Sequence, residues 1–309
     1  MALAYLGDIE LPAHAKPGGF DHAAVHGQRG RLYVAHTVND ALDVIDCTTK
    51  AYAGSVRDLA GVAGALVCEE QDLVFTSNRA ENTVGIFSPT RERTVVKVKV
   101  GIRPNGLAYD PGRRLLLAAN VGDPSIVGSF TVSLVDVAAK RMIVEIPVPG
   151  RTRWAVFDPD SGCFYVNIAD PPQIVVIEAA TVERIARAFT IPVAGPHGLD
   201  LDTARRRLFC ACDGRTLVVL DCRSGDVLAQ AELGGVPDVI FFNAALRHLY
   251  VAIGDPGVIE VFETDRMRRV ETVATERGAH TLAFDRLRNT VFAFLPETHR
   301  AAVYEDRGY

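Results

Sequence analysis

The sequence predicts an all-β fold, a seven-bladed β-propeller with four-stranded blades. Short segments alternate apolar and polar residues, and the turns between them are rich in Gly, Asp and Asn. A unit that opens on phrases such as "GPHGLDLD" recurs seven times, at intervals of 41 to 48 residues. Each unit continues with a second apolar strand, as in "RLFCAC", and a third, as in "LVVLD". Four short strands in a repeat of this length are typical of a propeller blade.

The repeats indicate one domain over residues 1–309, with blades that start near residues 18, 60, 101, 149, 193, 234 and 276. The last repeat ends one strand short, after "RAAVYEDRGY". We expect residues 4–12, "AYLGDIELP", to supply the missing outer strand and to close the ring. Closure removes the exposed edges that an open sheet would leave.

Composition narrows the classes of function. The chain is 48% hydrophobic with a net charge of −5 and has no basic block, which argues against a nucleic-acid partner or an anionic membrane surface. There is no signal peptide pattern and no apolar run that could span a membrane. Six cysteines without C-x-x-C spacing favour a reduced, cytoplasmic protein. A closed propeller needs no obligate protein partner, so we expect a monomer.

One column of residues stands out when the first strands are aligned. Innermost propeller strands begin at the rim of the central channel, so such a column forms a ring around the channel mouth. Blades five, six, seven and one are neighbours in a closed ring, and three of the eight histidines fall at their column positions. In blade order the column is His22, Gly64, Asn105, Arg153, His197, Asp238 and His280.

The arc of His197, Asp238, His280 and His22 predicts a metal site. Three imidazoles and a carboxylate are a standard first shell for a divalent transition metal, zinc foremost and iron, manganese or nickel as alternatives. All three rings must lean inward to share one ion. Purely structural roles are the alternative to this prediction. A residue at this turn position commonly caps its own strand, and histidines that line a water-filled channel can simply bind water.

The opposite half of the ring suits a substrate. Asn105 offers an amide, and Arg153 offers a planar cationic fork that fits a carboxylate or a phosphate. Trp154 is the only tryptophan and packs against either a ligand or the next blade.

Candidate acid/base groups lie on the column and on the loops between second and third strands, which open on the same face. They are Asp238 and His36, the latter as a fourth nitrogen or a general base. Weaker candidates on the same loops are Asn78, Arg79, Asn120, Asp213 and Glu297.

The repeats carry a family resemblance. "RLYVAHTVNDALDVID", "LVFTSNRAENTVGIFS" and "RPNGLAYDPGRRLLLAANVGD" resemble the YVTN-type repeats of YncE and the seven-bladed lactonase-like propellers, over essentially the whole chain. This superfamily includes binding proteins, lactonases and metal-dependent lyases, and the fold does not choose among them. Propeller lyases that cleave streptogramins or peptidyl-hydroxyglycine hold a metal and histidines in the same channel. The column differs from the gluconolactonase type, whose ring is dominated by Glu, Asn and Asp.

Two functions follow as expectations. The first is a metal-dependent enzyme, a hydrolase or a lyase, that acts on a small carbonyl-containing, anionic molecule at the channel mouth. The ion would polarise a carbonyl or activate a water. The alternative is a non-catalytic propeller that binds a small ligand, a metal or a protein partner on the same face. The chain has no G-x-S-x-G motif, which disfavours serine hydrolysis.

Overall fold

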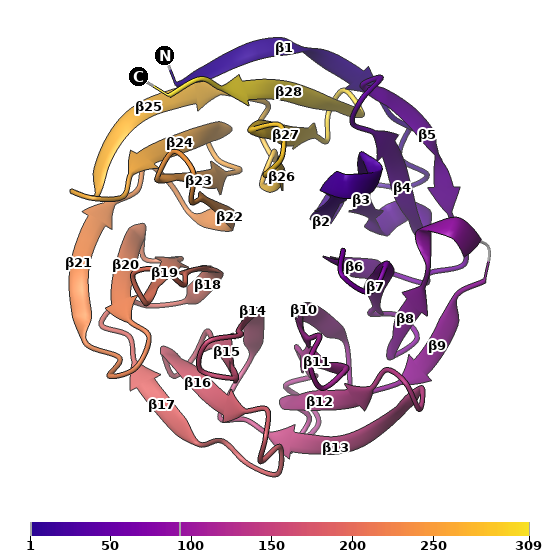
Figure 1. Cartoon of the computed structure of the whole chain (residues 1–309), viewed down its shortest axis with the longest axis vertical. Helices are drawn as coiled ribbons and strands as arrows, with labels where there is room; N and C mark the ends of the chain where they lie inside the picture. Colours follow the sequence, from indigo (N-terminus) through magenta and orange to yellow (C-terminus); the bar gives the residue numbers. More distant parts are fainter. Residues whose placement is uncertain (1, 93, 309) are drawn as a thin grey trace.

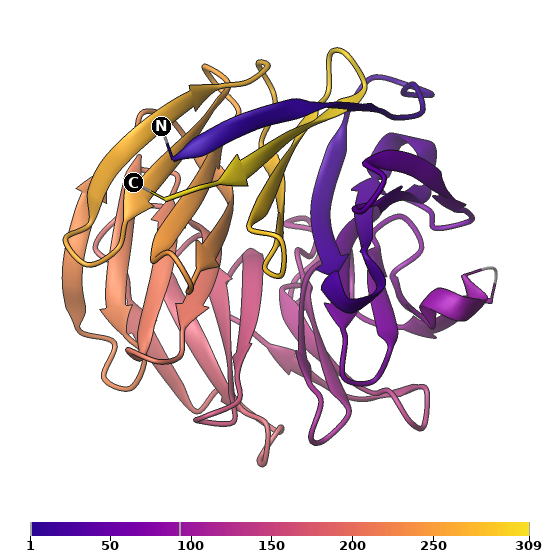
Figure 2. The same ribbon diagram turned by 45° about the horizontal axis from the view of Figure 1, so that its top comes forward.

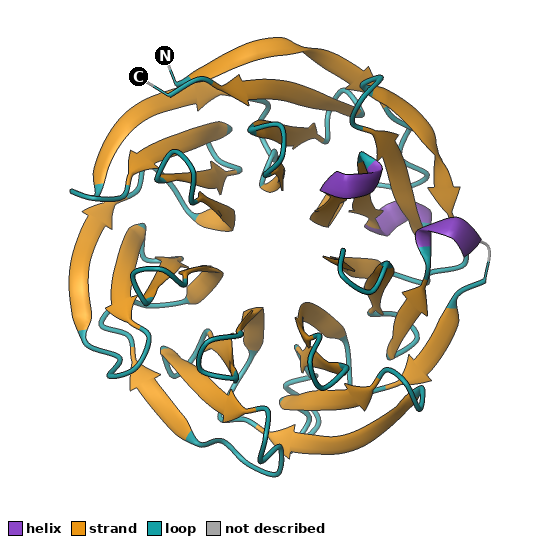
Figure 3. Cartoon of the chain, in the orientation of Figure 1, coloured by secondary structure: helices purple, strands orange, loops and turns teal. Residues whose placement is uncertain are grey.

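In a computed structural model that describes residues 2–92 and 94–308, seven four-stranded antiparallel sheets form a closed ring around a central channel (Figure 1). Nearly all regular structure is strand, and the short 3₁₀ helices are Gly27–Arg29, Thr37–Asn39 and Pro89–Arg91 (Figure 3). None of the helices in the described residues has the length and apolarity to cross a bilayer. The seven-bladed propeller predicted from the sequence is confirmed.

The innermost strand of each blade lines the channel. These strands are β2 (Phe20–His26), β6 (Val62–Cys68), β10 (Pro104–Asp110), β14 (Thr152–Asp158), β18 (Pro196–Asp202), β22 (Pro237–Asn243) and β26 (Thr281–Asp285). The second strands are β3 (Arg31–His36), β7 (Leu73–Asn78), β11 (Leu115–Asn120), β15 (Cys163–Ile168), β19 (Arg207–Cys212), β23 (His248–Ile253) and β27 (Thr290–Leu295).

The third strand of each blade is mostly buried, whereas the outermost strand is more exposed. The third strands are β4 (Ala41–Asp46), β8 (Thr83–Phe87), β12 (Thr131–Asp136), β16 (Gln173–Glu178), β20 (Thr216–Asp221), β24 (Val258–Glu263) and β28 (Arg300–Asp306). The outermost strands are β5 (Ala51–Val56), β9 (Val96–Lys99), β13 (Arg141–Pro147), β17 (Arg187–Thr190), β21 (Val227–Glu232), β25 (Arg268–Ala274) and, in blade seven, β1 (Leu3–Glu10).

The N-terminal strand closes the ring. β1 pairs antiparallel with β28, from Leu3 opposite Asp306 to Glu10 opposite Arg300, and the two chain ends lie beside each other (Figure 2). The backbone N–H of Leu3 also donates to Glu271 Oε2 at 2.9 Å, which ties β1 to the neighbouring blade. β1 is therefore the outermost strand of the last blade and covers the outer edge of β28.

Carboxylates at strand ends fix the turns on the face opposite the channel mouth. Asp202, at the end of β18, accepts a hydrogen bond from the backbone N–H of Arg205, and Asp285, at the end of β26, accepts one from Leu287. Side chains of this kind stabilise turns because they bond to backbone N–H groups two or three residues on. Between the turns, apolar side chains of adjacent blades interdigitate, as Tyr165 and Leu208 do between blades four and five.

Candidate functional site at the channel mouth

The strand register corrects the column of residues expected at the mouth. Leu199 lies opposite Cys210, and its equivalents in the first two blades are Ala23 opposite Val34 and Ala65 opposite Thr76. Counting back two residues, His197 is equivalent to Asp21 and Ala63. The placement of His22 and Gly64 in this column was therefore wrong by one residue. The ring at the mouth is Asp21, Ala63, Asn105, Arg153, His197, Asp238 and His280.

Close packing between innermost strands explains the glycines at the next position. A Cβ on Gly64, Gly106 or Gly198 would lie within 2.4 Å of a backbone carbonyl of the next blade. In the case of Gly198, that carbonyl belongs to Asp238 and would be 2.3 Å away. Glycine is required here because neighbouring backbones approach closely, not because of an unusual φ angle. His22 and Trp154 occupy this deeper position in blades one and four.

His197 lies at the centre of the mouth between two carboxylates. Its Nδ1 is 2.7 Å from Asp213 Oδ1, and its Nε2 is 3.2 Å from Asp238 Oδ1. On the other side of Asp238, the Nε2 of His280 lies 3.9 Å from Oδ2. The Nδ1 of His280 donates to the backbone carbonyl of Gly278 at 2.8 Å, which fixes that ring. The structure thus brings His197, Asp238 and His280 together from three consecutive blades.

Electrostatics favour the protonated form of His197. Burial disfavours its charge, but Asp238 and Asp213 outweigh burial and raise the pKa of His197 to about 9. Burial likewise works against ionisation of Asp238, yet His197 holds the pKa of that carboxyl well below its usual range. The two half-buried side chains therefore favour an imidazolium–carboxylate pair at neutral pH.

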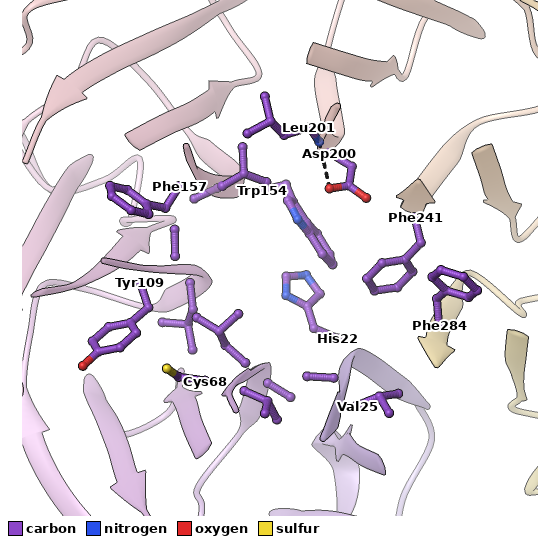
Figure 4. A pocket seen from close by; sticks show the side chains of 18 of the residues that line it. His22, Val25, Cys68, Tyr109, Trp154, Phe157, Asp200, Leu201, Phe241 and Phe284 are labelled. Atoms are coloured by element: carbon purple, nitrogen blue, oxygen red, sulfur yellow. Dashed lines mark hydrogen bonds between the residues drawn. The ribbon is translucent and has the colours of Figure 1, made fainter. Parts of the chain in front are cut away.

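His22 does not join this group. Its Nε2 is 3.3 Å from Asp21 Oδ1, and its ring contacts the indole of Trp154, with centroids 4.0 Å apart (Figure 4). Burial lowers the pKa of His22, so the ring is neutral at neutral pH. His22 and Trp154 meet across the channel from blades one and four. They separate the mouth from a lower channel that lies beneath them.

The other half of the mouth is rich in arginine. Arg153 Nη2 lies 3.4 Å from Asp213 Oδ2, and its Nη1 lies 3.1 Å from His197 Nε2. Arg79 pairs with Asp21 at 3.3 Å. The pKa of Arg151 is lowered by burial and by the nearby guanidinium groups of Arg153, Arg79 and Arg103. Four arginines therefore gather at one side of the channel.

Three of these arginines and one amide have unused hydrogen-bonding capacity. In the described part of the chain, the side chains of Arg103 and Arg151 form no ion pair. The Oδ1 of Asn105 and the Nε of Arg153 are buried and have no hydrogen-bond partner. Buried polar atoms of this kind are costly unless something satisfies them.

The structure places His36 elsewhere. Its side chain is fully buried, with Nδ1 2.7 Å from Asp43 Oδ2 and Nε2 2.6 Å from His14 Nδ1. His14 in turn stacks edge-on against His299, with ring centroids 4.3 Å apart. His36 contacts none of the residues that meet at Asp238. Its predicted role as a general base or fourth metal ligand remains untested.

The donor atoms at the mouth determine whether it fits a metal ion. Within residues 2–92 and 94–308, no three His, Cys, Asp or Glu side chains are arranged so that they could hold one ion. At His197, a metal would have to displace both a strongly held proton and the guanidinium of Arg153. The metal site predicted on His22, His197, His280 and Asp238 stays a prediction.

Several residues at the mouth were missed or underrated from the sequence. Asp213 was a weak candidate, yet it orients both His197 and Arg153. Arg103 and Arg151 were missed, although "GIRP" and "GRTR" place an arginine directly before two innermost strands. Asp21 was missed because His22 beside it matched the other histidines.

Comparisons with known proteins show the fold alone. No family model matches the chain, and no curated protein matches it. Among solved structures, it is similar to hydrazine synthase of Kuenenia stuttgartiensis, with a TM-score of 0.84 and 13% identity over 96% of this chain and 98% of that chain. It is also similar to a chain of the mitotic checkpoint complex, with a TM-score of 0.81 and 9% identity over 97% of this chain and 91% of that chain.

Proposed function

We propose that the channel mouth binds a small anionic molecule, a carboxylate or a phosphate. The observation that carries this proposal is the gathering of Arg79, Arg103, Arg151 and Arg153 on one side of the mouth, two of them in no ion pair among the described residues. Clustered guanidinium groups repel one another, and an anion bound between them relieves that repulsion. Their planar forks also match carboxylate and phosphate geometry.

The two halves of the mouth suit different ends of one ligand. Arg151 and Arg103 are free to move onto an anion, whereas Arg153 is held in place by Asp213. Across the channel, His197, Asp238 and His280 offer donors and an acceptor to a carbonyl or hydroxyl group of the same ligand. The buried Oδ1 of Asn105 is a further acceptor. A molecule that is anionic at one end and carries a carbonyl or hydroxyl group at the other fits this arrangement.

Calorimetric titration with acetate, succinate, citrate and inorganic phosphate tests the proposal. We expect saturable binding of at least one anion, weakened about 10- to 100-fold in Arg151→Gln and Arg153→Gln, because a hydrogen bond to a charged group contributes about 1.5–3 kcal/mol. Arg266→Gln, in the turn between β24 and β25 on the opposite face, is the matched control. Binding that is unaffected by both mouth substitutions would place the ligand elsewhere.

A metal-dependent hydrolase or lyase at the same mouth is the second candidate. The observation that favours it is the anchoring of both imidazoles through Nδ1, to Asp213 and to the carbonyl of Gly278, which directs both Nε2 atoms toward Asp238. Such anchoring is typical of metal-bound histidines. Less than about 0.2 equivalents of any transition metal in purified protein, with no uptake on titration, would remove this candidate. Retained metal with unchanged affinity in His197→Ala would show that the ligands lie elsewhere.

The family relationship is also a proposal. The repeat phrases support membership of the YVTN-type group of propellers, beyond the seven-bladed fold itself. Within that group both binding proteins and enzymes occur, so membership alone does not decide between the two candidates.

A further inference from the structure

The lower channel is a separate cavity of about 440 Å³ beneath the contact between His22 and Trp154. It reaches the turns between first and second strands, because Pro111, Thr203 and Arg286 line it. Of the residues expected at the site, only His22 and Trp154 line this cavity. It opens toward the face opposite the mouth and is independent of the proposed function.

Aromatic rings and one carboxylate define its chemistry. The side chains of Trp154, Phe241 and Phe284 lie around one end of the cavity, and the carboxylate of Asp200 lies beside them (Figure 4). Trp154 and Phe241 are edge-to-face, with ring centroids 6.5 Å apart. Most of the remaining lining is aliphatic.

Asp200 is a half-buried acid that forms no ion pair within the described residues. Its oxygens accept hydrogen bonds from the backbone N–H groups of Leu201, at 2.8 Å, and Phe242, at 2.6 Å. No Lys, Arg or His of the described chain lies within ion-pair distance of it. Burial raises the pKa of Asp200, against the opposing effect of Arg286 at the cavity opening. A carboxylate held in an apolar cavity attracts a cation that can also satisfy aromatic surroundings.

We propose that the lower channel binds an organic ammonium ion, with Asp200 as its counter-ion and the rings of Trp154, Phe241 and Phe284 around its alkyl groups. Aromatic faces attract cations through the ring quadrupole, and the attraction is larger where water is excluded. An alkylammonium also buries apolar surface, which suits the aliphatic wall. A neutral molecule of the same shape gains the apolar contacts but not the charge interactions.

The only tryptophan of the chain reports on this cavity directly. We would titrate the protein with choline and with its uncharged isostere 3,3-dimethylbutan-1-ol while following Trp154 fluorescence. We expect choline to change the emission saturably and to bind at least about 10-fold more tightly than the alcohol. Asp200→Asn should weaken choline binding about 10-fold or more. Asp255→Asn, an exposed carboxylate after β23 at the mouth, is the matched control and should leave binding unchanged.

Arg286→Gln independently tests whether the cavity selects for positive charge, and it removes no backbone contact of Asp200. It should tighten choline binding severalfold, because a positive charge at the opening opposes a cation. Equal binding of choline and the alcohol, an unchanged affinity in Asp200→Asn, or weaker choline binding in Arg286→Gln would each overturn the proposal. Because the probe is cationic and the reporter lies below the mouth, these outcomes do not depend on anion binding by the arginines.

Discussion

His22 and Trp154 meet ring to ring across the channel, although they belong to blades one and four and are far apart in sequence. Their contact is possible because the equivalent position is glycine in blades two, three and five, which leaves the channel axis free for two large side chains. It divides the channel into a charged mouth and an apolar lower cavity. The mouth is the proposed anion site, and the lower cavity is the proposed site for an organic cation.

Removing this contact should connect the two compartments. In His22→Ala we expect acrylamide to quench Trp154 fluorescence more strongly, since one face of the indole loses its cover. We also expect the free energy of unfolding to fall by about 2 kcal/mol, the usual scale for truncating a buried ring whose site partly relaxes. Quenching experiments and urea denaturation measure both effects. His280→Ala, which removes a half-exposed imidazole at the mouth, should leave quenching unchanged; equal quenching in His22→Ala and wild type would contradict the barrier.

The glycine at position 198 should tolerate no side chain. In Gly198→Ala the new Cβ would lie 2.3 Å from the carbonyl oxygen of Asp238, so one of the two innermost strands must move. We expect a loss of about 3 kcal/mol in unfolding free energy, comparable with other overpacking changes in well-packed interiors. Gly112→Ala is the control, because its nearest neighbour is the Asp110 side chain at 3.3 Å. Similar losses in the two variants would refute the close-approach explanation.

The protonation of His197 should make stability depend on pH. Its pKa is about 9 in the folded protein and about 6.5 when unfolded, so the folded state binds the proton more tightly. The resulting stabilisation, on the order of 2–3 kcal/mol, is fully present below pH 6.5 and is lost as pH rises through 9. The difference in unfolding free energy between wild type and His197→Gln should shrink across this window. A constant difference from pH 6 to pH 9.5 would show that His197 is not charged in the folded state.

The fold was predictable because every propeller blade repeats the same pattern of strands and turns. Each unit alternates apolar and polar residues and ends its strands on turn-forming carboxylates, so the seven repeats and the missing strand could be read directly. The closing pair of β1 and β28 followed from the incomplete last repeat. Neither conclusion needed side-chain detail.

The site was predictable only in part, because residue type and residue position can conflict. Matching His22 to His197 by type shifted the first blade by one residue, whereas the bulge at the start of six of the seven innermost strands sets the true register. Matching Gly64 to Gly198, the second glycine of "GPHG", would have placed the second blade correctly. Asp213 and Arg151 could not be ranked, since their importance arises from partners on other loops or blades.

Asp200 shows the limit of pattern analysis most clearly. In the sequence, Asp200 is the first acid of "GLDLD" and looks like an ordinary polar residue of an alternating strand. Its position beside Trp154, Phe241 and Phe284 depends on how blades four to seven pack around the channel. The alternating pattern of one strand does not carry that information.

The proposed anion site between the arginines of the mouth is tested most directly by a crystal structure of the protein with the panel anion that binds most tightly. We predict ligand density in contact with Arg151 and Arg153. Ligand density away from these two arginines would contradict the proposal.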